Sequence, residues 1–185
     1  MFKNLDTFKI KKDKNLSDYF ANAKFDNLSI NCNILKGNFF SDSFNYFPIT
    51  DNEETFSMLF NREYNDTSHF FTDNFYKVFI ERKKLFKSYK DVFVLGTNAA
   101  DNYYSNLLQF LPRIFFNKNK KIKLAIHRNS SRKFRKFIKK ILTLIGTEFT
   151  YIYLDDDFYY FKNSEFPQFI NLTDFKKILK NFLNS

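Results

Sequence analysis

Cysteine, tryptophan, glycine and proline are scarce in this sequence. Its 185 residues include one cysteine, no tryptophan, three glycines and three prolines. Because Cys32 stands alone, an intrachain disulfide is excluded, and so is a metal site built from cysteine thiolates. A chain without disulfides is typical of a reducing compartment.

Long apolar runs are also missing. No segment approaches the roughly 18 consecutive apolar residues that a membrane-spanning helix needs. Charged residues at positions 9 and 11–14 interrupt the region where an export signal would have its apolar core. We therefore expect a cytoplasmic protein, which could still lie against the surface of a membrane.

Most motifs of common enzyme classes are absent. The sequence has no glycine-rich dinucleotide loop, phosphate-binding Walker loop or nucleophile elbow. Its two histidines, His69 and His127, cannot form a metal site by themselves. We expect no cofactor and no bound metal.

Aromatic residues and positive charge are abundant. The chain has 28 phenylalanines and 11 tyrosines, carries a net charge of +10, and is 44% hydrophobic. This composition and length predict one globular domain spanning residues 1–185, with residues 1–70 as a less regular N-terminal extension.

The segment from Asp91 to Arg113 joins a strand to a helix. Asp91 is followed by four apolar residues, three of them β-branched or aromatic, which predicts a buried strand over 91–95 that ends at Gly96. A helix is predicted from Asp101 until Pro112 stops or kinks it. Its apolar stripe, spaced at i, i+3, i+4 and i+7, consists of Tyr104, Leu107, Leu108 and Leu111.

After residue 117 the pattern alternates between strand and helix. Strands are predicted at 121–127, 149–154 and 158–161, with helices at 131–146 and from 173 or 174 to 183. This alternation predicts an α/β fold with a mainly parallel, Rossmann-like sheet flanked by helices, plus a β-rich N-terminal portion. The predicted core residues of the two best helices are Leu108, Leu111, Phe134, Ile138, Ile141 and Leu142.

The N-terminal part gives a weaker pattern. Apolar spacing predicts a short helix over 16–23, and Glu53 with Glu54 predicts the first turn of a helix over 53–61. Residues 36–38 predict the turn of a hairpin between strands at 28–35 and 39–40. Residues 48–52 are predicted as a loop and 75–81 as a strand.

The central segment resembles a known family of enzymes. Its sequence N-Y-Y-S-N-L-L-Q-F-L-P-R, residues 102–113, is similar to the segment N-Y-Y-H-W-L-L-D-x-L-P-R of family-61 glycosyltransferases, the group of plant xylosyltransferases and bacterial capsular-polysaccharide enzymes. The similarity covers residues 75–170, the N-terminal half of such an enzyme. Ser105, Asn106 and Gln109 stand where the family has histidine, tryptophan and aspartate.

The resemblance implies a role in surface-polysaccharide synthesis. Such enzymes transfer a sugar from a nucleotide diphosphate with inversion; their N-terminal lobe faces the acceptor and their C-terminal lobe holds the nucleotide. The implied partners are a nucleotide-sugar or glycan acceptor and a second lobe or partner subunit. The candidates for substrate contact in this segment are Asn102, Tyr103, Ser105, Asn106, Gln109 and Arg113.

A long stretch around the second predicted helix is basic. Residues 117–147 contain no acidic residue. Such a face can bind phosphate or anionic lipid, or it can be an ordinary solvated surface, whereas nucleic acid is disfavoured because no recognised binding motif accompanies the charge. The candidates for phosphate or lipid contact are Arg128, Arg132, Lys133, Lys136 and Lys140.

Two further features lie at the ends of predicted strands. His127 precedes the basic helix, where α/β proteins place ligand contacts, although a surface histidine would look the same. Asp155 and Asp157 follow an apolar strand, as in the D-x-D signature of metal-dependent glycosyltransferases, but three aspartates also form an ordinary solvated turn.

Three functions therefore remain open, the last of them a small metal-dependent transferase built on Asp155 to Asp157. The first is a partial or degenerate glycosyltransferase that transfers sugar only together with its missing lobe, because neither a hydroxyl nor an amide can act as a general base near neutral pH. The alternative is a non-enzymatic binding or scaffold protein that uses the basic helix for anionic lipid or a partner.

Overall fold

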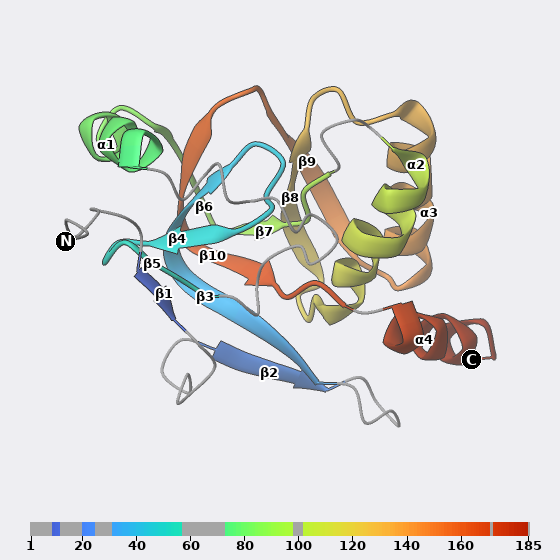
Figure 1. Cartoon of the computed structure of the whole chain (residues 1–185). Helices are drawn as coiled ribbons and strands as arrows, with labels where there is room; N and C mark the ends of the chain where they lie inside the picture. The colour runs from blue at the N-terminus through green and yellow to red at the C-terminus, as the bar shows by residue number, and fades with distance from the viewer. Residues whose placement is uncertain are drawn as a thin grey trace.

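The protein has a mixed α/β fold (Figure 1). The computed structural model describes residues 9–11, 20–24, 31–56, 73–97, 102–170 and 172–184. The strands are β1 (Lys9–Lys11), β2 (Phe20–Lys24), β3 (Asn31–Asp42), β4 (Pro48–Thr50), β5 (Glu54–Phe56), β6 (Lys87–Lys90), β7 (Val92–Val94), β8 (Lys121–His127), β9 (Glu148–Leu154) and β10 (Phe158–Pro167). The helical segments are α1 (Asp73–Arg82), α2 (Tyr103–Ser105), the π-helix η3 (Asn106–Phe110), the 3₁₀-helix η4 (Leu111–Phe116), α3 (Arg132–Leu144) and α4 (Leu172–Asn184).

Most described strands belong to one mostly parallel sheet. Its main path has the order β2-β3-β10-β7-β8-β9, with β4 beside β3 and β6 beside β10. Strands β6 to β10 pair in parallel, whereas β2, β3 and β4 pair antiparallel. Strands β1 and β5 pair separately.

Three neighbouring strand segments change direction at the same level of the sheet. Gly37, Asp91 and Asn163 all have positive φ, at 124°, 57° and 45°. Asn163 Nδ2 donates to Asp91 Oδ1 (2.6 Å), and Asp91 N donates to Lys162 O (3.0 Å), so the two turns are tied together. The β6–β7 segment and β10 consequently bend together (Figure 1).

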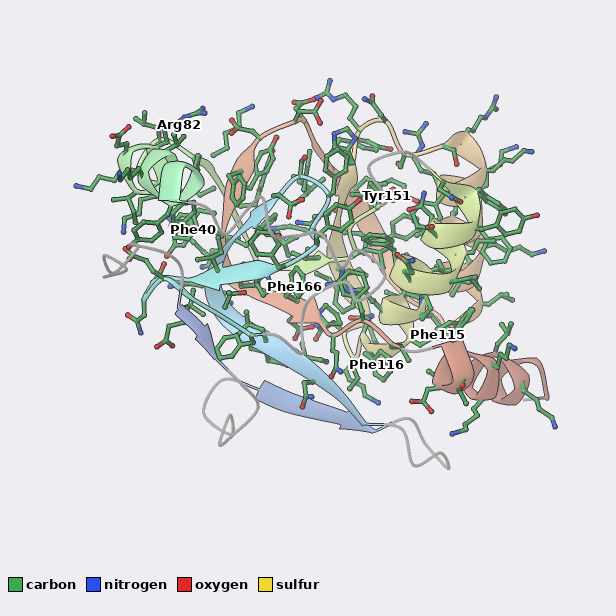
Figure 2. The ribbon with its side chains drawn as sticks, in the orientation of Figure 1. Phe40, Arg82, Phe115, Phe116, Tyr151 and Phe166 are labelled. Carbon is green, nitrogen blue, oxygen red and sulfur yellow. The ribbon has the colours of Figure 1, made fainter. Side chains whose placement is uncertain are left out.

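The alternating sides of the strands fill two cores. Phe93 of β7 and Leu95, which follows this strand, belong to one core with Phe134 and Ile138 of α3. The alternate residues Val92 and Val94 belong to a second core, which also contains Ala125, Leu154, Phe39 and Phe161. Figure 2 shows Phe166 and Phe116 inside the molecule and Arg82 outside it.

The predictions after residue 117 are confirmed. Strands β8 and β9, the first part of β10, and helices α3 and α4 lie where the alternation predicted them. Ser131 Oγ accepts the Phe134 N–H (3.2 Å) as the N-cap of α3, and Gly146 follows this helix with a φ of 69°. Strand β7 is also confirmed.

The predicted hairpin and the strand at 75–81 are wrong. Strand β3 runs through Gly37, which bends it instead of reversing it. Residues 75–81 lie in helix α1, because Tyr76, Phe79 and Ile80 recur with helical spacing and pack on the core.

The predictions before residue 61 also differ from the structure. Residues 20–23 of the predicted first helix lie in strand β2, while 16–19 lie outside the described residues. Residues 54–56 form strand β5 instead of a helix, and 57–61 are not described. The predicted loop at 48–52 contains strand β4, which pairs antiparallel with residues 39–41 of β3.

The central helix has a different register from the predicted one. Leu108 is 37% exposed and Tyr104 is 75% exposed, whereas Asn106, Gln109 and Phe110 are buried. The cause is the π-helical stretch 106–110, which rotates the apolar stripe relative to an α-helix. The remaining predicted core residues, Leu111, Phe134, Ile138, Ile141 and Leu142, are buried as expected.

Candidate functional site

The carboxyl ends of β7, β8 and β9 lie at one edge of the sheet. These three strands are parallel neighbours, so His127 at the end of β8 lies at the same edge as Thr97 and Asp155, which follow β7 and β9. Ligands of open α/β sheets bind outside the carboxyl ends of the strands. We therefore define the carboxyl edge as residues 96–97, 127–131 and 155–157.

His127 is buried at this edge with both ring nitrogens bonded. It is 4% exposed, and the ring of Phe44 stacks on it at 4.5 Å. Nδ1 accepts the Asn129 backbone N–H (3.2 Å). The ring N–H is therefore on Nε2, which donates to Asp156 Oδ1 (3.0 Å). The imidazole in this arrangement has no free lone pair for a substrate proton.

Arg128 lies at the solvent side of the edge. Its Nε donates to Asp155 Oδ1 (2.7 Å), and its side chain remains largely exposed. The adjacent Ser131 caps the beginning of α3, where backbone amides of the first turn lack acceptors inside the helix. Ser130 is 3% exposed, and within the described structure its hydroxyl has no hydrogen-bond partner. An exposed cation next to helix amides can bind the oxygens of a phosphate.

The loop after β3 covers the edge, which the sequence analysis missed. The buried Asp42 carboxylate accepts the backbone N–H groups of Phe44 (2.8 Å), Asn45 (3.0 Å) and Tyr46 (3.2 Å). Burial raises the pKa of Asp42 to about 6, although these hydrogen bonds oppose the shift. Asp42 and Asn45, which stand between apolar runs, are the sequence signal that could have predicted a turn here.

Gly96 allows this loop to approach the end of β7. Its φ is 77°, and a Cβ at this position would lie 2.6 Å from Phe44 O. Thr97 N donates to the same Phe44 carbonyl (3.2 Å). The loop and the carboxyl edge are thus fixed to each other.

The candidates on the central segment divide into surface and interior groups. Asn102 is exposed and caps α2, with Oδ1 accepting the Tyr104 N–H (3.0 Å), and Tyr103 and Ser105 are half-buried. Asn106 and Gln109 are buried, and Asn106 Oδ1 accepts the Thr97 hydroxyl (2.9 Å). Only the first group is available to a ligand at the surface.

Arg113 is fully buried and binds the ends of two strands. Its Nη1 donates to Leu95 O after β7 (2.7 Å), and its Nε donates to Pro167 O of β10 (2.9 Å). The guanidinium lies 4.3 Å from the Phe166 ring centre and 4.5 Å from that of Phe169. Burial lowers its pKa below the ordinary value. Arg113 therefore joins β7 to β10, where the strand order reverses.

The three aspartates after β9 each have a different partner. Asp155 binds Arg128, Asp156 binds His127, and Asp157 Oδ1 accepts the Phe158 N–H (2.8 Å). Among the described residues there is no cluster of three or more His, Cys, Asp or Glu side chains that could hold a metal. Among the helices that the structure describes, none is both long enough and apolar enough to cross a membrane.

The basic candidates on α3 lie on its solvent side. Arg132, Lys133, Lys136 and Lys140 are exposed, opposite the buried Phe134 and Ile138. Phe137 is 40% exposed, and Leu144 is 63% exposed. This helix thus presents apolar side chains among lysines.

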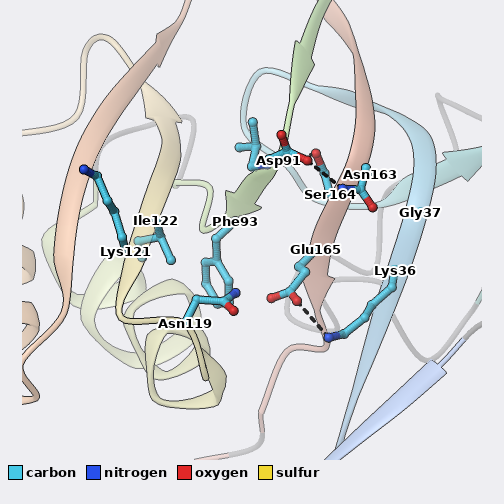
Figure 3. A pocket seen from close by; sticks show the side chains of 11 residues that line it. Lys36, Gly37, Asp91, Phe93, Asn119, Lys121, Ile122, Asn163, Ser164 and Glu165 are labelled. Carbon is cyan, nitrogen blue, oxygen red and sulfur yellow. Dashed lines mark hydrogen bonds and ion pairs between the residues drawn. The ribbon is translucent and has the colours of Figure 1, made fainter.

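A pocket of about 400 Å³ lies at the bend of the sheet (Figure 3). Its polar side chains pair with one another: Lys36 with Glu165 (2.8 Å) and Asn163 with Asp91 (2.6 Å). Phe93 and Ile122 supply apolar lining but are themselves buried. No helix begins among its lining residues, so this pocket offers a phosphate no helix amides, whereas the carboxyl edge adjoins the amino end of α3.

Comparisons with family models, curated proteins and solved structures find no match to this chain.

Proposed function

We propose that this protein is a one-domain, cytoplasmic, glycosyltransferase-like protein of surface-polysaccharide synthesis. Its sheet would act as a Rossmann-like platform that binds the phosphates of a nucleotide-sugar at the carboxyl edge. The observation that carries the proposal is the convergence of parallel β7, β8 and β9 on the amino end of α3 beside Arg128.

Sugar transfer would require a second lobe. A general base needs a free lone pair near the acceptor hydroxyl, but both nitrogens of His127 are bonded within the protein. Ser105 and Gln109 cannot accept a proton near neutral pH, and Gln109 is buried. The chain by itself would bind ligand without turning it over.

Nucleotide binding, monitored by NMR of the backbone amides, tests the proposal. UDP and UDP-glucose should shift the amides of residues 127–132, and Arg128→Glu with Arg132→Glu should weaken binding at least about tenfold. The control Lys176→Glu with Lys180→Glu changes two exposed lysines on α4 and should leave binding unchanged. If only a neutral oligosaccharide shifts residues 127–132, the edge binds the acceptor instead, and if neither ligand does, the proposal fails.

Attachment of α3 to an anionic membrane is the second candidate function. Lys133, Lys136 and Lys140 are exposed on one side of the helix, and Phe137 and Leu144 project beside them. Lysines near an anionic bilayer contribute about 1 kcal/mol each, and isolated apolar side chains can enter its interfacial region. This arrangement supports a scaffold at a membrane surface.

Vesicle sedimentation tests this candidate. The protein should sediment with phosphatidylglycerol-containing vesicles at low salt but not with phosphatidylcholine alone. Reversing Lys133, Lys136 and Lys140 to Glu should abolish sedimentation, and Phe137→Ser with Leu144→Ser should weaken it. The control Leu85→Ser changes a 79% exposed leucine outside α3. Wild-type protein that stays in the supernatant at low salt would exclude this function.

A further inference from the structure

Strand β9 forms an open end of the sheet. It pairs with β8 on one side, and no described strand pairs with it on the other. Glu148 N donates to Lys120 O (2.8 Å), and Leu154 O accepts from Arg128 N (2.8 Å), so the even-numbered residues are bonded toward β8. The N–H and C=O groups of Phe149, Tyr151 and Tyr153 consequently point away from the sheet.

Strands β6 and β4, which also lie at described edges, carry features that discourage pairing with another chain, and β9 lacks these features. Strand β6 has four residues, two of which are the exposed lysines Lys87 and Lys90. Strand β4 has three residues and begins at Pro48. Short length, lysine and proline each discourage strand addition. Strand β9 has seven residues, and from Phe149 to Leu154 it contains no charge, proline or glycine.

Basic side chains line this open edge on the side of α3. Tyr151 donates its hydroxyl hydrogen bond to Arg135 O (3.0 Å), and the Arg135 guanidinium lies 5.8 Å from the Tyr153 ring centre. Lys139 is exposed one helical turn further along the same side. An added strand would thus have Arg135 and Lys139 above one of its faces.

We propose that β9 is the docking site for an extended, acidic segment of a partner protein, which adds to the sheet as a further strand. The segment would bond to the outward backbone groups of Phe149, Tyr151 and Tyr153. Its acidic residues would occupy alternate positions on the face toward α3. This interaction would be independent of phosphate binding at the carboxyl edge.

The spacing of the basic residues matches alternate positions of a strand. Residues four apart on a helix are separated by about 6 Å along its axis. Side chains two apart on a strand are separated by about 6.7 Å. Carboxylates at alternate positions could therefore meet Arg135 and Lys139 together. A second copy of this chain fits less well, because its own basic α3 would lie close to the same charges.

Hydrogen exchange with a synthetic peptide tests the proposal. The probe is a short peptide in which glutamate alternates with valine and threonine; its counterpart has lysine in place of glutamate. The glutamate peptide should slow exchange at Phe149, Tyr151 and Tyr153. Thr150 and Ile152 provide an internal control, since their amides already bond to β8. The lysine peptide should have no effect.

Charge reversal separates strand addition from non-specific attraction. Arg135→Glu with Lys139→Glu should weaken binding of the glutamate peptide at least about tenfold. Lys136→Glu with Lys140→Glu makes the same change in net charge on another side of α3 and should have little effect. Equal loss in both variants, or no protection of the odd-numbered amides, would overturn the proposal. Protection without peptide, together with a dimer in sedimentation velocity, would overturn it in favour of self-pairing.

Discussion

Gly96 is the residue at which the end of β7 meets the loop after β3. Gly96→Ala should lower stability by about 2–4 kcal/mol, because the added Cβ meets Phe44 O at 2.6 Å and the φ of 77° is unfavourable for alanine. Gly146→Ala is the matched control. It has a similar φ of 69° but no atom within 4 Å of the new Cβ, and should cost only about 1–2 kcal/mol. Urea denaturation of both variants measures the difference; equal losses would show that the contact with Phe44 is unimportant.

Asp42 makes the stability depend on pH in an unusual direction. Its pKa is raised to about 6 by burial, from an ordinary value of 3.8, so between these values the folded protein binds more protons than the unfolded chain. The contribution of Asp42 is therefore fully present below about pH 4 and is lost as the pH rises through 6. The shift of about two units corresponds to a loss of about 3 kcal/mol.

The substitution Asp42→Asn isolates this contribution. Relative to the Asp42→Asn variant, the wild type should lose stability between about pH 4 and pH 7. Denaturant unfolding of both proteins across this range measures the difference and cancels the titration of other groups. A stability difference that is constant with pH, or that grows in favour of wild type as pH rises, would contradict the assigned shift.

At the scale of elements, η3 decides which leucines of the central segment are buried. Leu108→Asn should change stability by less than about 0.5 kcal/mol, because the side chain is 37% exposed. Leu111→Asn should cost about 2–4 kcal/mol, because the amide would enter the core at a position that is 2% exposed. Thermal unfolding distinguishes the two. A large loss of stability in Leu108→Asn would instead support the regular α-helical register, in which Leu108 is buried.

Elements whose partners are close in sequence could be predicted from local pattern. Helix α3 has a cap at Ser131, an apolar stripe and Gly146 after its end, and strands β8 and β9 on either side of it pair with each other. Strand β3 could not be predicted in this way, because its partner β10 lies far along the chain and the Lys36-Gly37-Asn38 signal is the same for a bend and a reversal.

In the candidate site too, local features could be predicted from the sequence and contacts between distant residues could not. His127 and Arg128 could be assigned to a loop after a strand by pattern alone. The stacking of Phe44 on His127 joins residues that are distant in sequence, so no local signal reveals it. Asn106 and Arg113 belong to the resembled segment, yet their burial depends on the π-helical turn and on β10. Resemblance could select these residues but could not tell surface from interior.

At the scale of the whole molecule, β10 holds the sheet together. It pairs with β3 on one side and with β6 and β7 on the other, and its end accepts the hydrogen bond from Arg113. The N-terminal strands β2 and β4 reach the rest of the sheet through β3. The interior of the molecule is therefore complete only when β10 is in place.

Because β10 is central but late in the sequence, β3 is synthesised well before the strand with which it pairs. Asn33 and its partner Gln168 are 135 residues apart, which corresponds to roughly 7–27 s at usual translation rates. During that interval the side of β3 that pairs with β10 has no partner strand, and Phe39 lacks its contacts with Phe161 and Phe166, so both are available to chaperones or to other nascent chains. Proteolysis of ribosome-bound chains arrested at increasing lengths should find β3 cleavable until β10 has emerged and protected afterwards. Protection of β3 from proteolysis before β10 has emerged would mean that another segment of the chain covers it.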